Sequence, residues 1–282
     1  MRLINNEETL RKYIPNVITT VKGETPLFDK LSPFLATAEN WIETNITSAT
    51  ILSAIAQERE DERSLILCRQ MVVAEAMKHA IPSLDVVLTP NGFGIVSNSN
   101  IAPASKERVK SLMDSMEELR DNAIELLLPI LMSDKEWQAT EQGSFFGGTL
   151  FPNINLATLC GYATHRWKQY LGLRHRTQVL EDTLAAEYIS QEQMQALREM
   201  NLQGTASFIQ THIISSLQNV IVDLLTDAKC ATRHAPHRLL PDIVEKMRSR
   251  EDEFPQWHSS HVAKLFSPPI FENKKENNGY WF

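Results

Sequence analysis

The chain has 282 residues, of which 43% are hydrophobic and 22% charged, and its net charge is -7 at pH 7. This is the composition of a soluble globular protein with enough chain for one large or two modest domains. It excludes intrinsic disorder, a disulfide scaffold and a membrane bundle, and the acidic balance argues against general coating of nucleic acid. Only 10 glycines, with many Ala, Leu, Glu, Gln and Met, favour helices.

The expected compartment follows from the cysteines and the first residues. Cys68, Cys160 and Cys230 are far apart and form no CxxC pair, which indicates reduced thiols. Acidic residues stand where a signal peptide would have its apolar region, and no apolar run approaches a membrane span. We expect a cytoplasmic or virion protein without membrane contact.

The first third of the chain predicts helices followed by a hairpin. Asn5 with Glu8 is a capping pair, and Thr25-Pro26 begins a second helix that Pro33 either kinks or divides. Residues 64–80 are apolar on most sides, which predicts a central buried helix. Residues 84–96 alternate around the turn residues at 89–92 and predict a β-hairpin.

A long helix is predicted from Ser105 to Pro129, with a short capped helix at 133–136 and a glycine-rich linker at 143–148. Apolar residues in the long helix alternate steps of three and four, as in a heptad seam. This seam consists of Val109, Leu112, Met116, Leu119, Ala123 and Leu126.

The second half predicts further helices at 155–171, 174–188, 190–200, 205–228 and 236–250. Residues 269–282 predict a second hairpin around Asn278-Gly279. Both hairpin turns end in Asn-Gly-aromatic, at 91–93 and 278–280, which suggests an internal duplication with little residue identity.

The expected fold class is therefore mainly α, with helical bundles and one or two β-hairpins. We place a helical bundle with its hairpin at residues 1–132 and a second helical region with an aromatic C-terminal hairpin at 133–282. A single large domain is the alternative.

Two candidate sites compete with plain structural roles. Cys230, His234 and His237, with later histidines, could ligate zinc, although the spacing is not that of a standard finger. A basic stretch with interleaved aromatic residues could bind phosphates and stack on bases, or Trp167 and Tyr170 could be core residues. Its cations are Arg166, Lys168, Arg174 and Arg176.

Apolar rings near the two hairpins are candidate interface anchors, because buried aromatic residues carry much of the energy of protein interfaces. They are Phe93, Tyr280, Trp281 and Phe282. No catalytic residue and no cofactor is predicted, since nucleotide-binding and hydrolase motifs are missing from the sequence.

Three segments together resemble an uncharacterised family from Bacteroidales genomes and their prophage-like elements. They are 3–15, the stretch from Val87 to Ser105 that contains Thr-Pro-Asn-Gly-Phe-Gly, and Gly279-Tyr-Trp-Phe at the end. The architecture is also similar to that of phage head–tail connectors, which are helical bundles with an arm that assemble into rings. This chain is about twice as long as such connectors and matches none of their motifs.

We therefore expect a non-enzymatic structural protein that self-associates, as connectors do, with itself or other virion proteins as partners. A nucleic-acid-binding or regulatory helical protein is the first alternative. A metal-binding protein or an enzyme of unknown reaction is the second.

Overall fold

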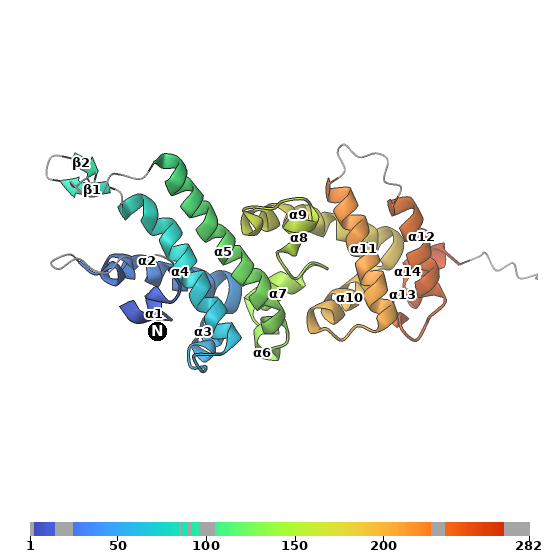
Figure 1. Ribbon diagram of the computed structural model, residues 1–282. Coiled ribbons are helices and arrows are strands. Elements are labelled where there is room, and N and C mark those ends of the chain that lie inside the picture. Colours follow the sequence, from blue (N-terminus) through green and yellow to red (C-terminus); the bar gives the residue numbers. More distant parts are fainter. Residues whose placement is uncertain are drawn as a thin grey trace, which may run out of the picture.

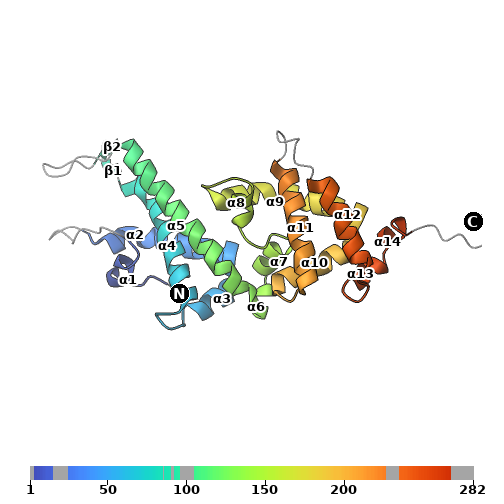
Figure 2. The same cartoon turned by 45° about the vertical axis from the view of Figure 1, so that its right-hand side comes forward.

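The computed structural model of the chain describes residues 3–14, 25–84, 86–89, 92–95, 105–226 and 235–267. They form two helical bodies arranged along an elongated molecule, a separation that persists when the molecule is turned (Figures 1 and 2). We call residues 3–147 the N-terminal unit and residues 150–267 the C-terminal unit. A hydrophobic core runs through both.

The N-terminal unit is built around two long antiparallel helices, α4 and α5 (Figure 1). Its elements are α1 (Glu7–Arg11), α2 (Leu27–Ile42), the π-helix η1 (Glu43–Thr47), α3 (Ala49–Ile55), α4 (Arg63–Leu84), β1 (Val86–Thr89), β2 (Gly92–Ile95), α5 (Lys106–Met132), α6 (Lys135–Gln138) and α7 (Glu141–Gly147). Helix α4 lies between α2 and α5 and is buried over most of its circumference, which confirms the predicted central helix. Helix α6 contacts α5, and α7 contacts η1, so both belong to this unit.

The C-terminal unit repeats this plan with a shorter central pair of helices. Its elements are α8 (Asn155–Leu159), α9 (Arg166–Leu184), the π-helix η2 (Ala185–Ile189), α10 (Gln191–Gln203), α11 (Phe208–Thr226), α12 (Ala235–Arg248), α13 (Pro255–His258) and α14 (His261–Leu265). Helices α11 and α12 form the central pair. No described helix has both the length and the apolar character needed to cross a bilayer.

The fold class is all-α, so the predicted class, mainly α with one or two β-hairpins, is corrected. Strands β1 and β2 have four residues each and pair with each other in an antiparallel register that sets Val86 opposite Ile95. Two strands of this length are marginal on their own in water and do not form an architectural layer. The hairpin expected at 269–282 lies outside the described residues.

Helix α5 buries only part of the predicted heptad seam, since Met116 and Ala123 are buried but other seam residues are not. Leu112 and Leu126 are 44% and 46% exposed, whereas Ile124 and Leu127 are fully buried. A straight helix with 3.6 residues per turn drifts away from a 3.5-residue seam unless it supercoils with its neighbour. The helix also continues through Pro129 to its end at Met132.

The glycine-rich segment at 143–148 is helix α7 and the residue after it, not a linker. A Cβ atom on Gly143 would collide with the carbonyl oxygen of Trp137. One on Gly147 would lie 2.6 Å from a methyl group of Leu202 in the C-terminal unit. Glycine is present here because backbone must approach its neighbours closely, which local sequence reasoning mistook for flexibility.

The helices predicted at 155–171 and 174–188 are divided differently in the structure. Gly161 and His165 have φ of 88° and 52°, which is the left-handed region, so α8 ends at Leu159 and α9 starts after His165. Gly172 lies within α9 without interrupting it.

The first sign of a duplication is a helix that widens into a π-helix and then ends at a serine. Ser48 after η1 and Ser190 after η2 have φ of 85° and 75° and nearly equal ψ. Each hydroxyl accepts a hydrogen bond from the backbone N–H three residues on and so caps the next helix. Positive φ costs a residue other than glycine of order 1–3 kcal/mol. A serine with positive φ after each π-helix therefore indicates that the same structural element occurs twice in the chain.

In each unit, a buried tryptophan near the end of the unit donates a hydrogen bond to a carbonyl of the π-helix. The indole Nε1–H of Trp137 donates to the carbonyl of Ile46 at 2.8 Å, and that of Trp257 donates to the carbonyl of Tyr188 at the same distance. Ile46 and Tyr188 each stand two residues before the serine. The two indoles are 0% and 2% exposed.

A hydroxyl residue three positions after each tryptophan continues the match. Thr140 and Ser260 both donate to the carbonyl of their tryptophan at 2.6 Å. Both also accept from a backbone N–H of the short helix that follows, α7 or α14.

A buried glutamate nine residues before each serine completes the repeat. Glu39 accepts a hydrogen bond from the backbone N–H of Leu3, and Glu181 accepts one from that of Leu150. Both carboxylates thereby fix the segment that enters the unit. Together, the serine, tryptophan, hydroxyl and glutamate contacts show that the chain holds two copies of one helical unit in tandem.

The repeated contacts relate the two units in a different register from the Asn-Gly-aromatic turns on which the predicted duplication was based. The strand pair connects α4 to α5, and the corresponding connection between α11 and α12 falls on residues 227–234, outside the described residues. The tail at 268–282 follows α14, so it does not correspond to the first hairpin.

Candidate interface between the two units

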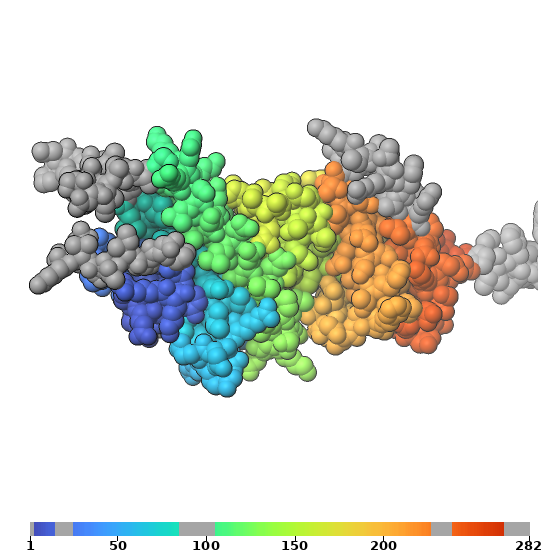
Figure 3. Space-filling model, viewed as in Figure 1, coloured from blue at the N-terminus to red at the C-terminus, as the bar shows by residue number. Residues whose placement is uncertain are grey.

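The junction between the units brings together buried charged and aromatic side chains from both of them. Helix α5 of the N-terminal unit lies against the start of α9, and the two units present one continuous surface where they meet (Figure 3). Arg166 at the start of α9 is 9% exposed and pairs with Glu125 and Asn122 of α5. His165 Nδ1 lies 2.6 Å from a carboxylate oxygen of Glu117.

Behind this contact lies a buried ion network centred on Arg120, which is 2% exposed. Its guanidinium donates to Glu75 of α4 and to Asp121, both at 2.7 Å, and to Glu117 at 3.1 Å. Burial alone would lower the pKa of Arg120, but Asp121 and Glu75 outweigh it and raise that pKa. Asp121 also accepts from the backbone N–H of Trp167, so the network reaches the C-terminal unit.

Aromatic rings from α2, α7 and α9 fill the other side of the junction. Trp41 and Trp167 meet edge to face with centroids 5.5 Å apart. The ring of Tyr170 stacks with Phe146 at 6.0 Å, which suits the offset geometry that aromatic pairs prefer. The guanidinium of Arg174 lies 3.8 Å from the ring centroid of Phe145 and also donates to its carbonyl.

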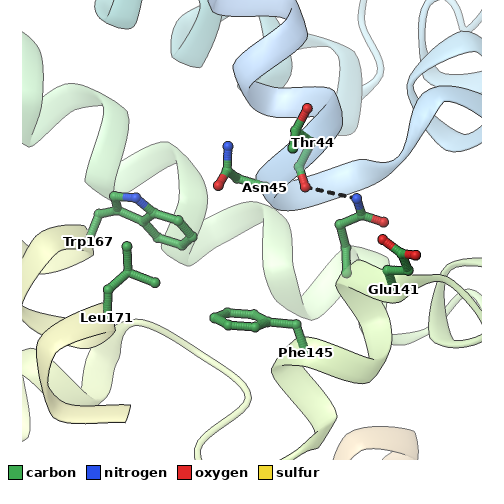
Figure 4. Close-up of a pocket in the computed structure, with 7 residues that line it drawn as sticks. Thr44, Asn45, Glu141, Phe145, Trp167 and Leu171 are labelled. Atoms are coloured by element: carbon green, nitrogen blue, oxygen red, sulfur yellow. Dashed lines mark hydrogen bonds between the residues drawn. The ribbon is translucent and has the colours of Figure 1, made fainter. Parts of the chain in front are cut away.

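A pocket of about 270 Å³ lies where η1, α7 and α9 meet. Thr44 and Glu141 line it from the N-terminal unit, and Trp167 and Leu171 line it from α9 (Figure 4). Gln142 donates to the carbonyl of Thr44 at 2.9 Å and closes one end. Helix α9 of the second unit therefore forms one wall of a groove that belongs to the first.

The four cations predicted to bind nucleic acid do not share one surface. Arg166 and Arg174 contact residues of the N-terminal unit at the junction. Lys168 is exposed, and Arg176 is exposed with one guanidinium nitrogen 3.4 Å from the carbonyl of Leu225. Trp167 and Tyr170, the aromatic residues of the same stretch, are buried core residues.

The remaining predicted site residues fall where the structure gives no side chain. Cys230, His234, Tyr280, Trp281 and Phe282 lie outside the described residues. His237 belongs to α12 and Phe93 to β2, but their side chains are not described. Among the side chains that are described, no group of three or more could hold a metal ion. The zinc and anchor assignments stay predictions.

Two of the three cysteines fall within the described residues, and both are free thiols. Cys68 is fully buried in α4, and burial raises the pKa of its thiol well above the usual value. This position suits a small core residue rather than a nucleophile.

Sequence reasoning did not identify Arg120, Asp121, Glu75 or Glu181 as buried. Charged residues in helices normally face water, and their partners here lie far away along the chain or on another helix. The available signal was the adjacent pair Arg120-Asp121 between Met116 and Ala123, since a charge so close to a buried stripe needs a partner.

Acid should weaken the junction through Glu117. Burial raises the pKa of this carboxyl, but the hydrogen bond from His165 and the charge of Arg120 outweigh it and hold the pKa below 4.5. A lowered folded-state pKa gives stability that is present above 4.5 and lost as the pH falls through the folded pKa. We expect Glu117→Gln to lose stability at neutral pH and much less near pH 3, measured by urea unfolding.

Glu199, which is exposed on α10 away from the junction, supplies the control for this measurement. Glu199→Gln should not reproduce the effect of Glu117→Gln. Equal pH dependence for Glu117→Gln and the unaltered chain would contradict the role assigned to Glu117.

Comparison with known proteins adds one match. Residues 14–147, just under half of the chain, match a family of unknown function (DUF6712). The match ends at the last residue of α7, where the N-terminal unit ends. This is consistent with the expected resemblance to an uncharacterised family. No curated protein and no solved structure matches the chain.

Proposed function

We propose that this protein is a non-enzymatic structural protein that self-associates, of the phage head–tail connector type. The observation that carries the proposal is the tandem duplication joined by a packed junction. Proteins built from repeated units gain stability and shape from contacts between neighbouring units, and such contacts extend readily from unit to unit. The function then lies in the geometry of the assembly.

The use of the charged residues supports this proposal. The buried guanidinium of Arg120 is bound by Glu75 and Asp121, and Arg198 donates to Glu181 at 2.7 Å. These groups hold helices and entry segments in place, as the contacts of Glu181 with Leu150 illustrate. Arg166 and Arg174 likewise hold the two units together, so they argue for assembly rather than for nucleic-acid binding.

The arrangement of the N-terminal unit also agrees with a connector. The strands β1 and β2 are inserted between the long helices α4 and α5 and lie at the end of the molecule farthest from the C-terminal unit (Figure 1). An arm in that place could reach a neighbouring subunit. A phage or prophage origin in Bacteroidales belongs to the same proposal.

The mass of the full chain in solution tests the proposal. We expect sedimentation equilibrium to give a mass above 32.1 kDa that rises with concentration to a defined oligomer. Portal and tail genes beside the gene would be the expected genomic neighbours. A strict monomer up to millimolar concentration, alone and with virion proteins of the same genome, would overturn the proposal.

A further inference from the structure

The C-terminal unit carries a groove that overlaps the position of the junction pocket, because Ala186, His261 and Val262 in its lining correspond to Thr44, Glu141 and Gln142. This groove has a volume of about 450 Å³ and is lined by η2, the start of α10, α13 and α14. Ala186 and His261 belong to its lining. Ala186 corresponds to Thr44, four residues before the serine, and His261 corresponds to Glu141, directly after the hydroxyl residue.

The two grooves differ in what covers them. In the N-terminal unit, Trp167 and Leu171 of α9 form the outer wall. In the C-terminal unit, every lining residue comes from the unit itself, and no described helix takes the place of α9. The groove that one unit fills is therefore left open in the other.

An exposed leucine at the end of α14 lies near the open groove in sequence without lining it, at the position that Phe145 has in the junction pocket. Leu265 stands five residues after Ser260, as Phe145 stands five residues after Thr140. Phe145 is covered by Tyr170 and the guanidinium of Arg174. Leu265 is 63% exposed, although it ends a helix whose neighbouring residues Val262 and Ala263 are buried.

We propose that this groove binds helix α2 of a second copy of the chain. The covering helix in the junction is α9, and α2 is its counterpart, because both run into a π-helix and a serine with positive φ. The existing junction thus supplies a backbone template for the contact between chains, in which Thr25 and Asp29 stand at the positions of Trp167 and Leu171.

The side chains of α2 suit this contact. Phe28 takes the place of Tyr170 and would bring an aromatic ring toward Leu265. Asp29 is exposed, takes the place of Leu171 and would lie near the imidazole of His261. An apolar pair beside a complementary polar pair is a usual composition for an interface core and its rim.

This inference rests on the proposed function and specifies its geometry. The groove and α2 are different surfaces of one chain, so the contact is heterologous and joins chains head to tail. Such contacts give a closed ring when the rotation between subunits closes, and a filament when it does not.

Two substitutions in the full chain test the contact. Leu265→Asp should weaken self-association by about 30-fold or more in sedimentation experiments, the effect of losing a central apolar anchor. Val179→Asp is the matched control, since Val179 is 51% exposed on α9 and lies on neither α14 nor α2. It should leave the association unchanged.

A mixing experiment then tests the head-to-tail arrangement. Asp29→Arg should impair the α2 face and leave the groove intact, while Leu265→Asp does the reverse. Each variant alone should be monomeric, and an equimolar mixture should form a dimer that does not grow further. A mixture that stays monomeric would overturn the inference.

Failure of this inference is distinguishable from failure of the proposed function. An unaltered chain that is always monomeric overturns both. An unaltered chain that assembles, together with a Leu265→Asp variant that assembles equally well, overturns only the groove. The latter result is also the one expected if residues 268–282 of the same chain fill the groove.

Discussion

Replacing Arg120 with methionine is expected to lower the free energy of unfolding by about 3–5 kcal/mol, the usual cost of breaking a buried ion pair. The substitution keeps the length of the side chain and removes the positive charge. Asp121, which is 1% exposed, would then be buried without its cation, and Glu75, which is 3% exposed, would keep only its contacts with Lys78 and His79. Urea unfolding followed by circular dichroism measures the loss.

Arg59 offers the matched control for this substitution. Its side chain is 76% exposed and pairs with Glu62 at the surface. Surface pairs contribute about 0–1 kcal/mol, so Arg59→Met should have little effect. A loss below about 1 kcal/mol for Arg120→Met would mean that the network does not hold α4 to α5 as the structure implies.

Removing either buried tryptophan should cost about 3–5 kcal/mol, because a large indole leaves a cavity in the core. We expect Trp137→Ala and Trp257→Ala to lower the free energy of unfolding by comparable amounts. Each indole holds the π-helix of its own unit, η1 or η2, through a hydrogen bond to the carbonyl of Ile46 or Tyr188. Chemical denaturation of the two variants measures both losses.

The corresponding phenylalanine variants separate packing from hydrogen bonding. Trp137→Phe and Trp257→Phe keep a ring but lose the donor, so each should lose less than its alanine counterpart. A large loss for one alanine variant with almost none for the other would contradict equivalent roles in two copies of one unit.

Much of the helical framework could be predicted because helix starts and buried stripes are local. The helices predicted to begin at Ser105 and at residue 190 are capped by these two serines, and the apolar residues of α4 identified the central helix. The predicted boundaries of elements were wrong where a tertiary contact, rather than the local sequence, determines the backbone conformation. Gly143 is the clearest case, because its missing side chain serves a close approach to Trp137.

The candidate site could not be predicted in the same way. Arg166 and Arg174 were predicted as nucleic-acid contacts, because a basic stretch has the same sequence whether its partners are phosphates or groups of another helix. Their partners Glu125 and Phe145 lie 41 and 29 residues away along the chain. Such pairings are decided by packing, which no local pattern encodes.

The residues that correspond in the two copies could not be predicted from the sequence for a related reason. The two copies share a backbone path, while most of the residues along it differ. Ile46 and Tyr188 contribute only a carbonyl group to the repeated contact, so their side chains were free to diverge. The Asn-Gly turns, from which a duplication was predicted, do not occupy corresponding places in the two copies.

Both proposals depend on the duplicated unit, which hydrogen exchange at the indole groups tests directly. The full chain has five tryptophans, and the resonances of Trp137 and Trp257 are assigned by their loss in the two phenylalanine variants. Both indole N–H groups are buried and bonded to backbone carbonyls, so both should persist in D₂O long after exposed indoles have exchanged. Rapid exchange at either tryptophan would contradict the repeat.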